Sequence, residues 1–372
     1  MVEGTSQRIL PAGARASNGT QRRPGLPDSA MASLRLGVIG IEHLHLFEMV
    51  DQLAATGFET VCHVGQGSLE ELYRNWRGNS EPRTPADIIG DDSLDLVVLA
   101  GVPSTRAATA VAAMQAGRHV LVAKPAVTSA DDLALIDRTA RSTGRRWWVF
   151  FSERLSNRAI TKAVELVGAG AIGDLVSISG WAPHSLQPTS RPDWFFNPML
   201  SGGILVDLAA HQGDQLLALA GPGITEVASA TVRNAASPTC PQFQDIGRMS
   251  LRHTTSSGRV VLSDHHVDWL SPSGLGTWGD VRLNLVGAAG TIEVRSNIDV
   301  TGIDGSEHLI LVDGDGARRI DCTATDVDWA ARLSADIASG SDSLMSHEHA
   351  VSACELTLRA QAVADGSYSS GG

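Results

Sequence analysis

Three side chains in the sequence are of the types that proton-transfer chemistry requires, and the first is Lys124. It stands in Val122-Ala123-Lys124-Pro125, directly after an apolar run that predicts a buried strand. Of 29 basic residues only Lys124 and Lys162 are lysines, so a surface role would ordinarily fall to arginine here. A compact ammonium with an adjustable pKa cannot be replaced by guanidinium. We therefore expect Lys124 to be functional and intolerant of arginine, and Lys162, in a polar stretch of a predicted helix, to tolerate it.

The other two side chains, Asp207 and His211, follow the glycine pair Gly202-Gly203. They lie four residues apart, and Asp214 follows three residues later, so all three should share one helical face. A carboxylate and an imidazole on one face can orient each other, which general acid–base catalysis needs. A surface ion pair is the alternative. The surrounding residues are apolar, which favours a functional cleft.

A turn that could bind a nucleotide follows the first predicted strand, but most of its glycines are replaced. A dinucleotide turn normally reads G-x-G-x-x-G, and here only Gly40 remains, with Glu42 and His45 at the other two positions. A carboxylate beside a pyrophosphate is unfavourable unless it points away, whereas His43 or His45 could donate to a phosphate. The acid that should bind a ribose is absent, since the second strand ends around His63. The turn alone leaves open a cofactor site or a Rossmann-like domain that has lost or altered it.

Histidine groups raise the question of a metal. They occur in the turn and at His265-His266 and His347-Glu348-His349, but no third ligand stands at a recognisable spacing. Packed or exposed histidines are commoner than ligands. We expect no metal site.

Composition limits the class of protein. The 372 residues are 43% hydrophobic, enough for two domains with full cores, and the net charge of −12 argues against nucleic-acid binding. Cys62, Cys240, Cys322 and Cys354 form no C-x-x-C pair, so a zinc ribbon or disulfide scaffold is not indicated and a reducing, cytoplasmic compartment is expected. No apolar run has the length of a membrane span.

The chain is expected to begin with a disordered leader over residues 1–30, and translation could start at Met31. Arg22-Arg23 resembles a twin-arginine export signal, but a proline-rich stretch replaces the apolar segment that should follow. We therefore expect no signal peptide.

Strands and helices should alternate from residue 34 to 151. Strands are expected at 34–40, 58–64, 94–100, 119–123 and 147–151, with helical spacing between them. This order is typical of a doubly wound parallel sheet, an α/β Rossmann-like domain over 31–151 in which ligands bind beyond the carboxyl ends of the strands.

Residues 152–346 should form an α+β domain with a mostly antiparallel open sheet. After one helix near 157–167, strands follow without regular helices between them, at 175–181, 227–232, 248–252, 259–262, 281–286, 291–295 and 309–312. A C-terminal helix and tail occupy 347–372.

These motifs together resemble the Gfo/Idh/MocA oxidoreductases, which include glucose-fructose oxidoreductase and inositol dehydrogenases. The resemblance runs from about 34 to 365 and rests on Ala123-Lys124-Pro125 and on G-G-x-L-x-D-x-x-x-H from Gly202 to His211. Val102-Pro103, Arg154 and Gly170-Ala171-Ile172-Gly173-Asp174 also match. Ala123, where the family usually has glutamate, and the turn at Gly40 depart from the pattern.

The resemblance implies hydride transfer with NAD or NADP on a sugar, cyclitol or similar small molecule. By analogy Lys124 holds the reacting oxygen, His211 is the general acid–base, and Asp207 orients the substrate or the histidine. Matching positions place the cofactor at Gly40, Ile41, Glu42, His43, Leu44, His63, Ala100, Pro103 and Lys124. They place the substrate at Arg154, Trp181, His184, Arg191, Asp193, Trp194, Asp207 and His211, although core packing is an equal alternative for the tryptophans.

The resemblance also implies a homodimer or homotetramer through the open sheet, with no nucleic-acid or membrane partner. Two alternatives remain: a non-catalytic ligand sensor on the same fold, and a glycosidase that oxidises its substrate transiently. The substrate, the choice between NAD and NADP, and the reaction direction stay open.

Overall fold

A computed structural model of the protein describes residues 33–78 and 80–366. The expected leader, the alternative start at Met31 and the end of the tail lie outside the described residues. The chain divides into two units, Met1–Ala32 and Ser33–Gly372, and every described element belongs to the second.

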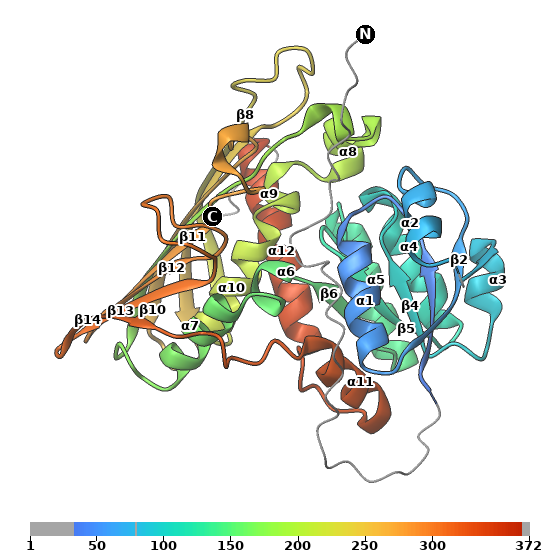
Figure 1. Ribbon diagram of the computed structural model, residues 1–372, viewed down its shortest axis with the longest axis horizontal. Helices are drawn as coiled ribbons and strands as arrows, with labels where there is room; N and C mark the ends of the chain where they lie inside the picture. The colour runs from blue at the N-terminus through green and yellow to red at the C-terminus, as the bar shows by residue number, and fades with distance from the viewer. Residues whose placement is uncertain (1–32, 79, 367–372) are drawn as a thin grey trace. The chain divides into compact units, whose positions relative to one another are not determined.

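The first sheet has six parallel strands in the order β3-β2-β1-β4-β5-β6. Strands β2, β4, β5 and β6 are labelled in Figure 1. Apart from the short edge strand β3, these strands are largely buried because helices cover both faces, which explains their continuous apolar runs. The predicted doubly wound sheet is confirmed, with one strand more than expected. The strands are β1 (Arg35–Ile39), β2 (Glu59–Val64), β3 (Glu81–Arg83), β4 (Leu96–Leu99), β5 (His119–Ala123) and β6 (Trp147–Phe150).

Five helices connect these strands. Ser129 caps the last of them by accepting a hydrogen bond from the N–H of Asp132, and Gly144 ends it in the left-handed conformation. The helices are α1 (His45–Ala55), α2 (Glu70–Trp76), α3 (Pro85–Gly90), α4 (Pro103–Gln115) and α5 (Ala130–Thr143).

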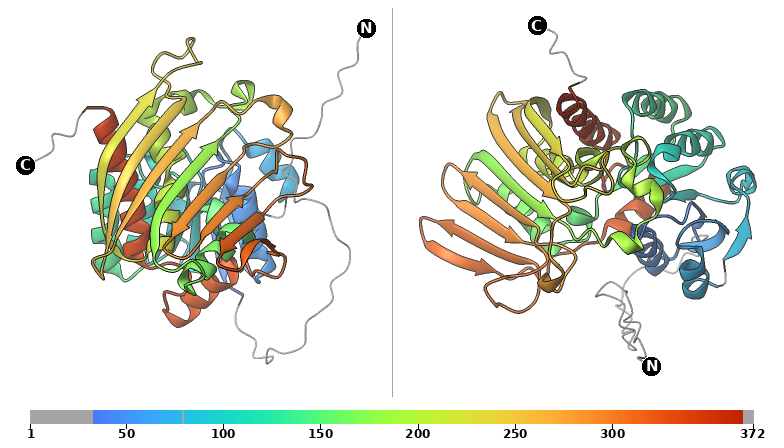
Figure 2. Two further views of the ribbon diagram at one scale, coloured as in Figure 1. Left: turned by 90° about the vertical axis from the view of Figure 1, so that its left-hand side faces the viewer. Right: turned by 90° about the horizontal axis from the view of Figure 1, so that it is seen from above.

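The second sheet has eight strands in the order β14-β13-β12-β11-β7-β10-β9-β8 and faces the viewer in Figure 2, left. Only the pair β7 and β10 is parallel, so the mostly antiparallel prediction is confirmed. The strands are β7 (Leu175–Pro183), β8 (Gly223–Arg233), β9 (Ile246–Thr255), β10 (Val260–Asp268), β11 (Arg282–Gly287), β12 (Thr291–Arg295), β13 (His308–Asp313) and β14 (Gly316–Ile320).

Helices cover the inner face of this sheet, and the last of them contacts elements of both sheets. That helix, α12 (His347–Ala364), packs on α5 and β6 as well as on α10 and β8. The α11 helix (Trp329–Ser339) packs on α1, with Trp329 and Leu333 in the core of the first sheet. The remaining helices are α6 (Ser152–Leu155), α7 (Arg158–Gly168), α8 (Pro198–Ser201), α9 (Ile204–Asp207) and α10 (Ala210–Ala220), with short 3-10 turns η1 (Pro188–Ser190), η2 (Asp193–Phe196) and η3 (Ser273–Leu275). Within the described ranges no helix is both long enough and apolar enough to cross a bilayer.

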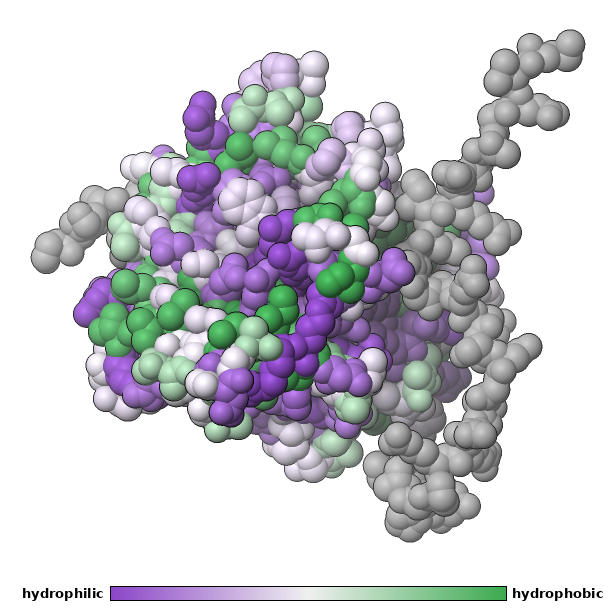
Figure 3. Space-filling model, turned by 60° about the vertical axis from the view of Figure 1, so that its left-hand side comes forward, coloured by the Kyte–Doolittle hydropathy of each residue, from purple (hydrophilic) through white to green (hydrophobic). Residues whose placement is uncertain are grey.

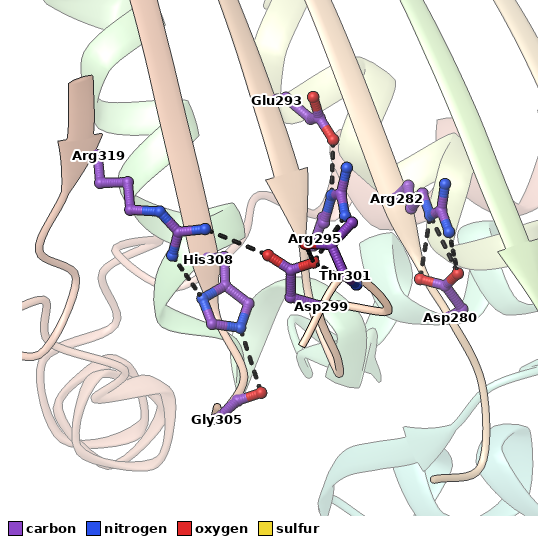
Figure 4. A network of polar contacts seen from close by, with 9 residues as sticks. All are labelled: Asp280, Arg282, Glu293, Arg295, Asp299, Thr301, Gly305, His308 and Arg319. Atoms are coloured by element: carbon purple, nitrogen blue, oxygen red, sulfur yellow. Dashed lines mark hydrogen bonds and ion pairs between the residues drawn. The ribbon is translucent and has the colours of Figure 1, made fainter. Parts of the chain in front are cut away.

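The outer face of the eight-stranded sheet carries no helix and mixes apolar with polar side chains (Figure 3). Its edge nearest β14 holds a charged network (Figure 4). There Asp299 accepts hydrogen bonds from Thr301, Arg295 and Arg319, and those from Thr301 do most to lower the pKa of Asp299. The network fixes the loop after β12 against β14.

Candidate active site

The site is built around a buried ion pair between the two sheets. Lys124 follows β5, where its peptide bond to Pro125 is cis, and it is 4% exposed. Its Nζ donates to Oδ1 of Asp207 over 2.8 Å, although 83 residues separate the two in the chain. The structure thus joins the predicted lysine and aspartate at the carboxyl end of the parallel sheet.

The glycine pair before α9 determines where Asp207 lies. Gly202 and Gly203 have φ values of +92° and +83°, which favour glycine. A Cβ on Gly203 would come within 2.7 Å of the amide oxygens of Gln244 and Gln361. These oxygens accept from the first N–H groups of α9. The pair therefore lets the chain approach two side chains that cap the helix.

Arg106 holds the backbone around Lys124. The sequence analysis did not identify this residue. Its guanidinium is buried and donates to the carbonyls of Gly101, Ala123 and Pro125 over 2.7–2.8 Å. Burial lowers its pKa to about 9, and the charge of Asp207 acts in the opposite direction. Arg106 thus holds the backbone on both sides of Lys124 and ties it to the turn after β4. Its sequence signal was a lone charge among the alanines of α4.

His211 lies in the first turn of α10 as a neutral ring. It is 2% exposed, and its Nδ1 has no hydrogen-bond partner. Burial, followed by the positive charge of Lys124, lowers its pKa well below the usual value. The helix is interrupted at Leu208 and Ala209, between Asp207 and His211. A neutral imidazole near an ammonium can accept a proton.

Asp214 follows His211 by three residues in α10, and it pairs with Arg154, whose predicted substrate role stays a prediction. Nε and Nη2 of Arg154 both donate to Asp214 over 2.7 Å, and Nε2 of His349 donates to the same carboxylate over 2.8 Å. Asp214 is fully buried. The contacts of Asp214 with Arg154 and His349 join α6, α10 and α12.

Gly40 lies where two strand ends touch. Its φ is +86°, and a Cβ there would come within 2.3 Å of the backbone of Gly101, after β4. This is the point at which the sheet order reverses, where ligands of doubly wound sheets bind.

Gly40→Ala should therefore destabilise the chain by more than backbone strain alone. Gly57→Ala is the matched control, since Gly57 has a φ of +99° with nothing within 4 Å of its Cβ position. We expect about 1–2 kcal/mol for the control and about 1–3 kcal/mol more for Gly40→Ala, measured by urea unfolding. Equal losses would show that the contact with Gly101 is unimportant.

His43 and His45 complete the turn before α1. Nδ1 of His43 accepts from the N–H of His45 over 3.2 Å, so the proton of the neutral ring is on Nε2, a potential phosphate donor. Burial is the main cause that lowers the pKa of both rings, and the charge of Lys124 adds to it. Nε2 of His45 lies 3.2 Å from the hydroxyl of Ser152. Leu44 is half exposed beside them.

Glu42 points away from the turn. Its carboxylate accepts from the indole Nε1 of Trp194 in η2 over 3.3 Å, and its N–H donates to the carbonyl of Ala100. The adjacent Ile41 is fully buried. The carboxylate that replaces a motif glycine therefore joins the turn to the second domain.

The remaining predicted cofactor positions are divided between the core and the sheet edge. His63 on β2 is buried, with Nδ1 2.9 Å from the hydroxyl of Ser80. Beside it, an open pocket of about 680 Å³ lies at the ends of β2 and β3, lined in part by Gly65 and Arg83. Pro103 opens α4 directly after the β4 turn.

Two predicted substrate residues, Arg191 and His184, belong to the second domain. Arg191 stacks over Phe195 and Trp269, with 4.6 and 5.0 Å to the ring centroids, and interacts electrostatically with Asp207. The charge of Lys124 contributes, after burial, to lowering the pKa of His184. Asp193 is exposed at the start of η2.

Trp181, a predicted substrate residue, lies on the outer face of the eight-stranded sheet in the single chain. Side chains alternate along β7, and Gly180 faces His265 and Gln212 on the inner side. Trp181 therefore points to the open outer face, where it is 48% exposed and stacks on His266 at 4.1 Å.

Glu153 in α6 is a buried carboxyl that the sequence analysis missed. Its Oε2 accepts from the amides of Gln212 and Gln215 over 3.1 Å each. Burial raises the pKa of Glu153 to about 7, against the lowering effect of Lys124. Its only signal was a charge at the end of an apolar segment.

No metal centre accompanies this site: within 33–78 and 80–366, no three histidine, cysteine or acidic residues gather as a ligand set. His347 and His349 instead lie 2.8 Å from Asp137 and Asp214.

Two family matches cover most of the described chain. Residues 34–151 match the family described as "Oxidoreductase family, NAD-binding Rossmann fold", and residues 160–293 match "GFO/IDH/MocA C-terminal domain". The chain belongs to the Gfo/Idh/MocA family of oxidoreductases, whose N-terminal domain is an NAD-binding Rossmann fold.

Individual relatives are distant. The chain is 25% identical to scyllo-inositol 2-dehydrogenase (NAD(+)) of Bacillus subtilis over 75% of this chain and 80% of that protein. It is 27% identical to the uncharacterized oxidoreductase YdgJ of Escherichia coli, but over only 51% of this chain and 54% of YdgJ.

Solved structures extend the likeness to the whole fold. A crystal structure titled "putative oxidoreductase from Erwinia carotovora atroseptica SCRI1043" superposes with a TM-score of 0.85 at 30% identity, over 89% of this chain and 98% of that one. Levoglucosan dehydrogenase in complex with NADH and levoglucosan has a TM-score of 0.72 at 17% identity, over 90% and 97%, and shares the fold.

Proposed function

We propose that the chain is an NAD(P)-dependent oxidoreductase that transfers a hydride between nicotinamide and a CH–OH group of a sugar, cyclitol or related molecule. The observation that carries this proposal is the buried pair of Lys124 and Asp207 at the carboxyl end of a parallel sheet. Burial of a charged lysine costs free energy unless a partner offsets it. Here the partner, Asp207, comes from the other domain.

Lys124 and His211 have different roles at the reacting oxygen. The Lys124 ammonium, held by Asp207, binds that oxygen and stabilises the negative charge that develops when its proton leaves. His211, neutral at physiological pH, takes the proton during oxidation and returns it during reduction. Asp207 keeps the ammonium in place for both directions.

The residues around Gly40 fit a dinucleotide. The turn approaches Gly101 too closely for a side chain, Glu42 points away, and Nε2–H of His43 is a donor that suits a phosphate. The pocket at the ends of β2 and β3 offers space for the adenosine end. When bound there, nicotinamide accepts or donates the hydride.

The substrate side combines aromatic surfaces with polar groups. Trp194 and His184 can pack against a sugar ring, and the guanidinium of Arg191 can donate to its hydroxyls. Relatives named as inositol dehydrogenases favour a cyclitol or sugar. A homodimer or homotetramer through the open sheet face stays a prediction.

Cofactor binding tests the proposal directly. Titration calorimetry with NAD⁺, NADH, NADP⁺ and NADPH should find at least one ligand with a Kd of roughly 1 μM to 1 mM. Nicotinamide absorbance with a panel of sugars and cyclitols should then show turnover. No binding at millimolar concentrations would favour a ligand sensor. Binding with glycoside cleavage but no net nicotinamide turnover would favour the glycosidase.

A further inference from the structure

A second pair of ionisable side chains lies beside the proposed site. Oε1 of Glu153, in α6, is 3.8 Å from Nε2 of His184, which follows β7. Both side chains are nearly enclosed, with 3% and 12% of their surfaces exposed. The proposed roles of Lys124 and His211 leave this pair unused.

The hydrogen bonds around the pair leave one acceptor on each side without a donor. Oε2 of Glu153 accepts from two amides, whereas its Oε1 is buried without a partner. Nδ1 of His184 lies 3.1 Å from the carbonyl of Ala182, which can only accept, so Nδ1 carries the ring proton. Nε2 of the neutral ring is then an acceptor. Two acceptors facing each other are unfavourable. The 3.8 Å between them is longer than a hydrogen bond, and a proton on Oε1 lets the two side chains close to one.

The surroundings decide which partner holds that proton. Burial and then the charge of Lys124 lower the pKa of His184 to about 3, with a smaller effect of Arg191. Burial raises the pKa of Glu153 to about 7, while Lys124, Gln215 and Gln212 lower it and Asp214 raises it. The proton therefore stays on Glu153 in weakly acidic solution and leaves near neutrality.

We propose that Glu153 is a titrating positioning residue, which as a carboxylic acid donates to Nε2 of His184 and holds that ring for the substrate. As a carboxylate it offers no donor, and His184 loses this anchor. The titration of Glu153 does not depend on the proposed oxidoreductase function, whereas its effect on substrate binding rests on that function. Lys124 and His211 act on the reacting oxygen whichever form Glu153 takes.

Glu153→Gln is the informative substitution. The oxygen of the introduced side-chain amide can still accept from Gln212 and Gln215, and its nitrogen donates to His184 at every pH. In the unaltered chain the KM for substrate should rise by up to about tenfold per pH unit above about pH 7, with kcat little changed. In the variant the KM should stay at its low-pH value. Unchanged pH dependence of KM in the variant would overturn the positioning role.

Glu48→Gln is the matched control. Glu48 lies in α1, burial also raises its pKa, and it accepts from Gln52, with no contact to His184. In Glu48→Gln the KM should still rise above about pH 7, as it does in the unaltered chain. If the rise disappeared in both variants, it would not be specific to Glu153, and the positioning role would be overturned.

Two readouts do not depend on turnover. Infrared titration should show a protonated-carboxyl band that disappears near pH 7, is absent in Glu153→Gln and remains in Glu48→Gln. The ring signals of His184, assigned through His184→Asn, should shift at the same midpoint. Absence of the band from the unaltered chain would overturn the inference even if Glu153→Gln failed to fold. Band and shift without nicotinamide turnover would reject the proposed function while supporting the titrating pair.

Discussion

Replacing Lys124 by alanine should lower kcat/KM by roughly a thousandfold or more, because it removes both the group that binds the reacting oxygen and the charge that stabilises it. Lys124→Arg should be similarly inactive, since a planar guanidinium cannot reproduce a compact ammonium at the same atom. The measurement is nicotinamide absorbance with a substrate found by the panel.

Two comparisons separate lost chemistry from lost stability. Alanine leaves Asp207 buried without its partner, whereas arginine keeps a positive charge beside it, so Lys124→Arg should unfold closer to the unaltered chain. Lys162→Arg should change nothing, because Lys162 is partly exposed and pairs with Glu165 on α7. Substantial activity in Lys124→Arg would contradict the role proposed for Lys124.

Asp214→Ala should reduce the free energy of unfolding by about 3–5 kcal/mol, because it leaves the buried charge of Arg154 without a partner. Urea unfolding measures the loss. The double variant Arg154→Met with Asp214→Leu should regain most of it, because apolar residues can replace a buried ion pair. A loss below about 1 kcal/mol in Asp214→Ala would contradict this account.

The same pair should make stability depend on pH. Burial acts to raise the pKa of Asp214, but Arg154 and His349 outweigh it, so the pKa in the folded chain lies below its usual value. The stabilisation is therefore present at neutral pH and is lost as the pH falls through the lowered pKa. In acid the gap between Asp214→Ala and the unaltered chain should narrow.

The sequence predicts the architecture well where its patterns are long. Alternating apolar runs and helical spacing identify five of the six parallel strands and place Lys124 at the sheet edge. It misses β3, which has three residues including Pro82, because so short a run carries no periodicity. The helix α11 is missed as well, although Trp329 and Leu333 are buried with helical spacing.

Contacts across long chain separations limit what the sequence can say about the site. The family motifs predict that Lys124 and Asp207 share a site. Nothing in the local sequence indicates that Arg154 and His349 donate hydrogen bonds to Asp214. The outer position of Trp181 could not be predicted, because alternation along a strand shows that its two faces differ, not which one the helices cover. Glu153 stands out only once its burial and its two amide donors are known.

The hydrogen bond between Glu42 and Trp194 gives the molecule an internal optical reporter. Trp194 is one of eight tryptophans, and its indole N–H bonds to a carboxylate of the glycine-poor turn, across 152 residues of chain. Because indole fluorescence responds to the partner of its N–H, any movement of the turn that shifts Glu42 alters the emission of Trp194. The departure from the usual glycine pattern thus makes events at the turn visible in the intrinsic fluorescence of the other domain.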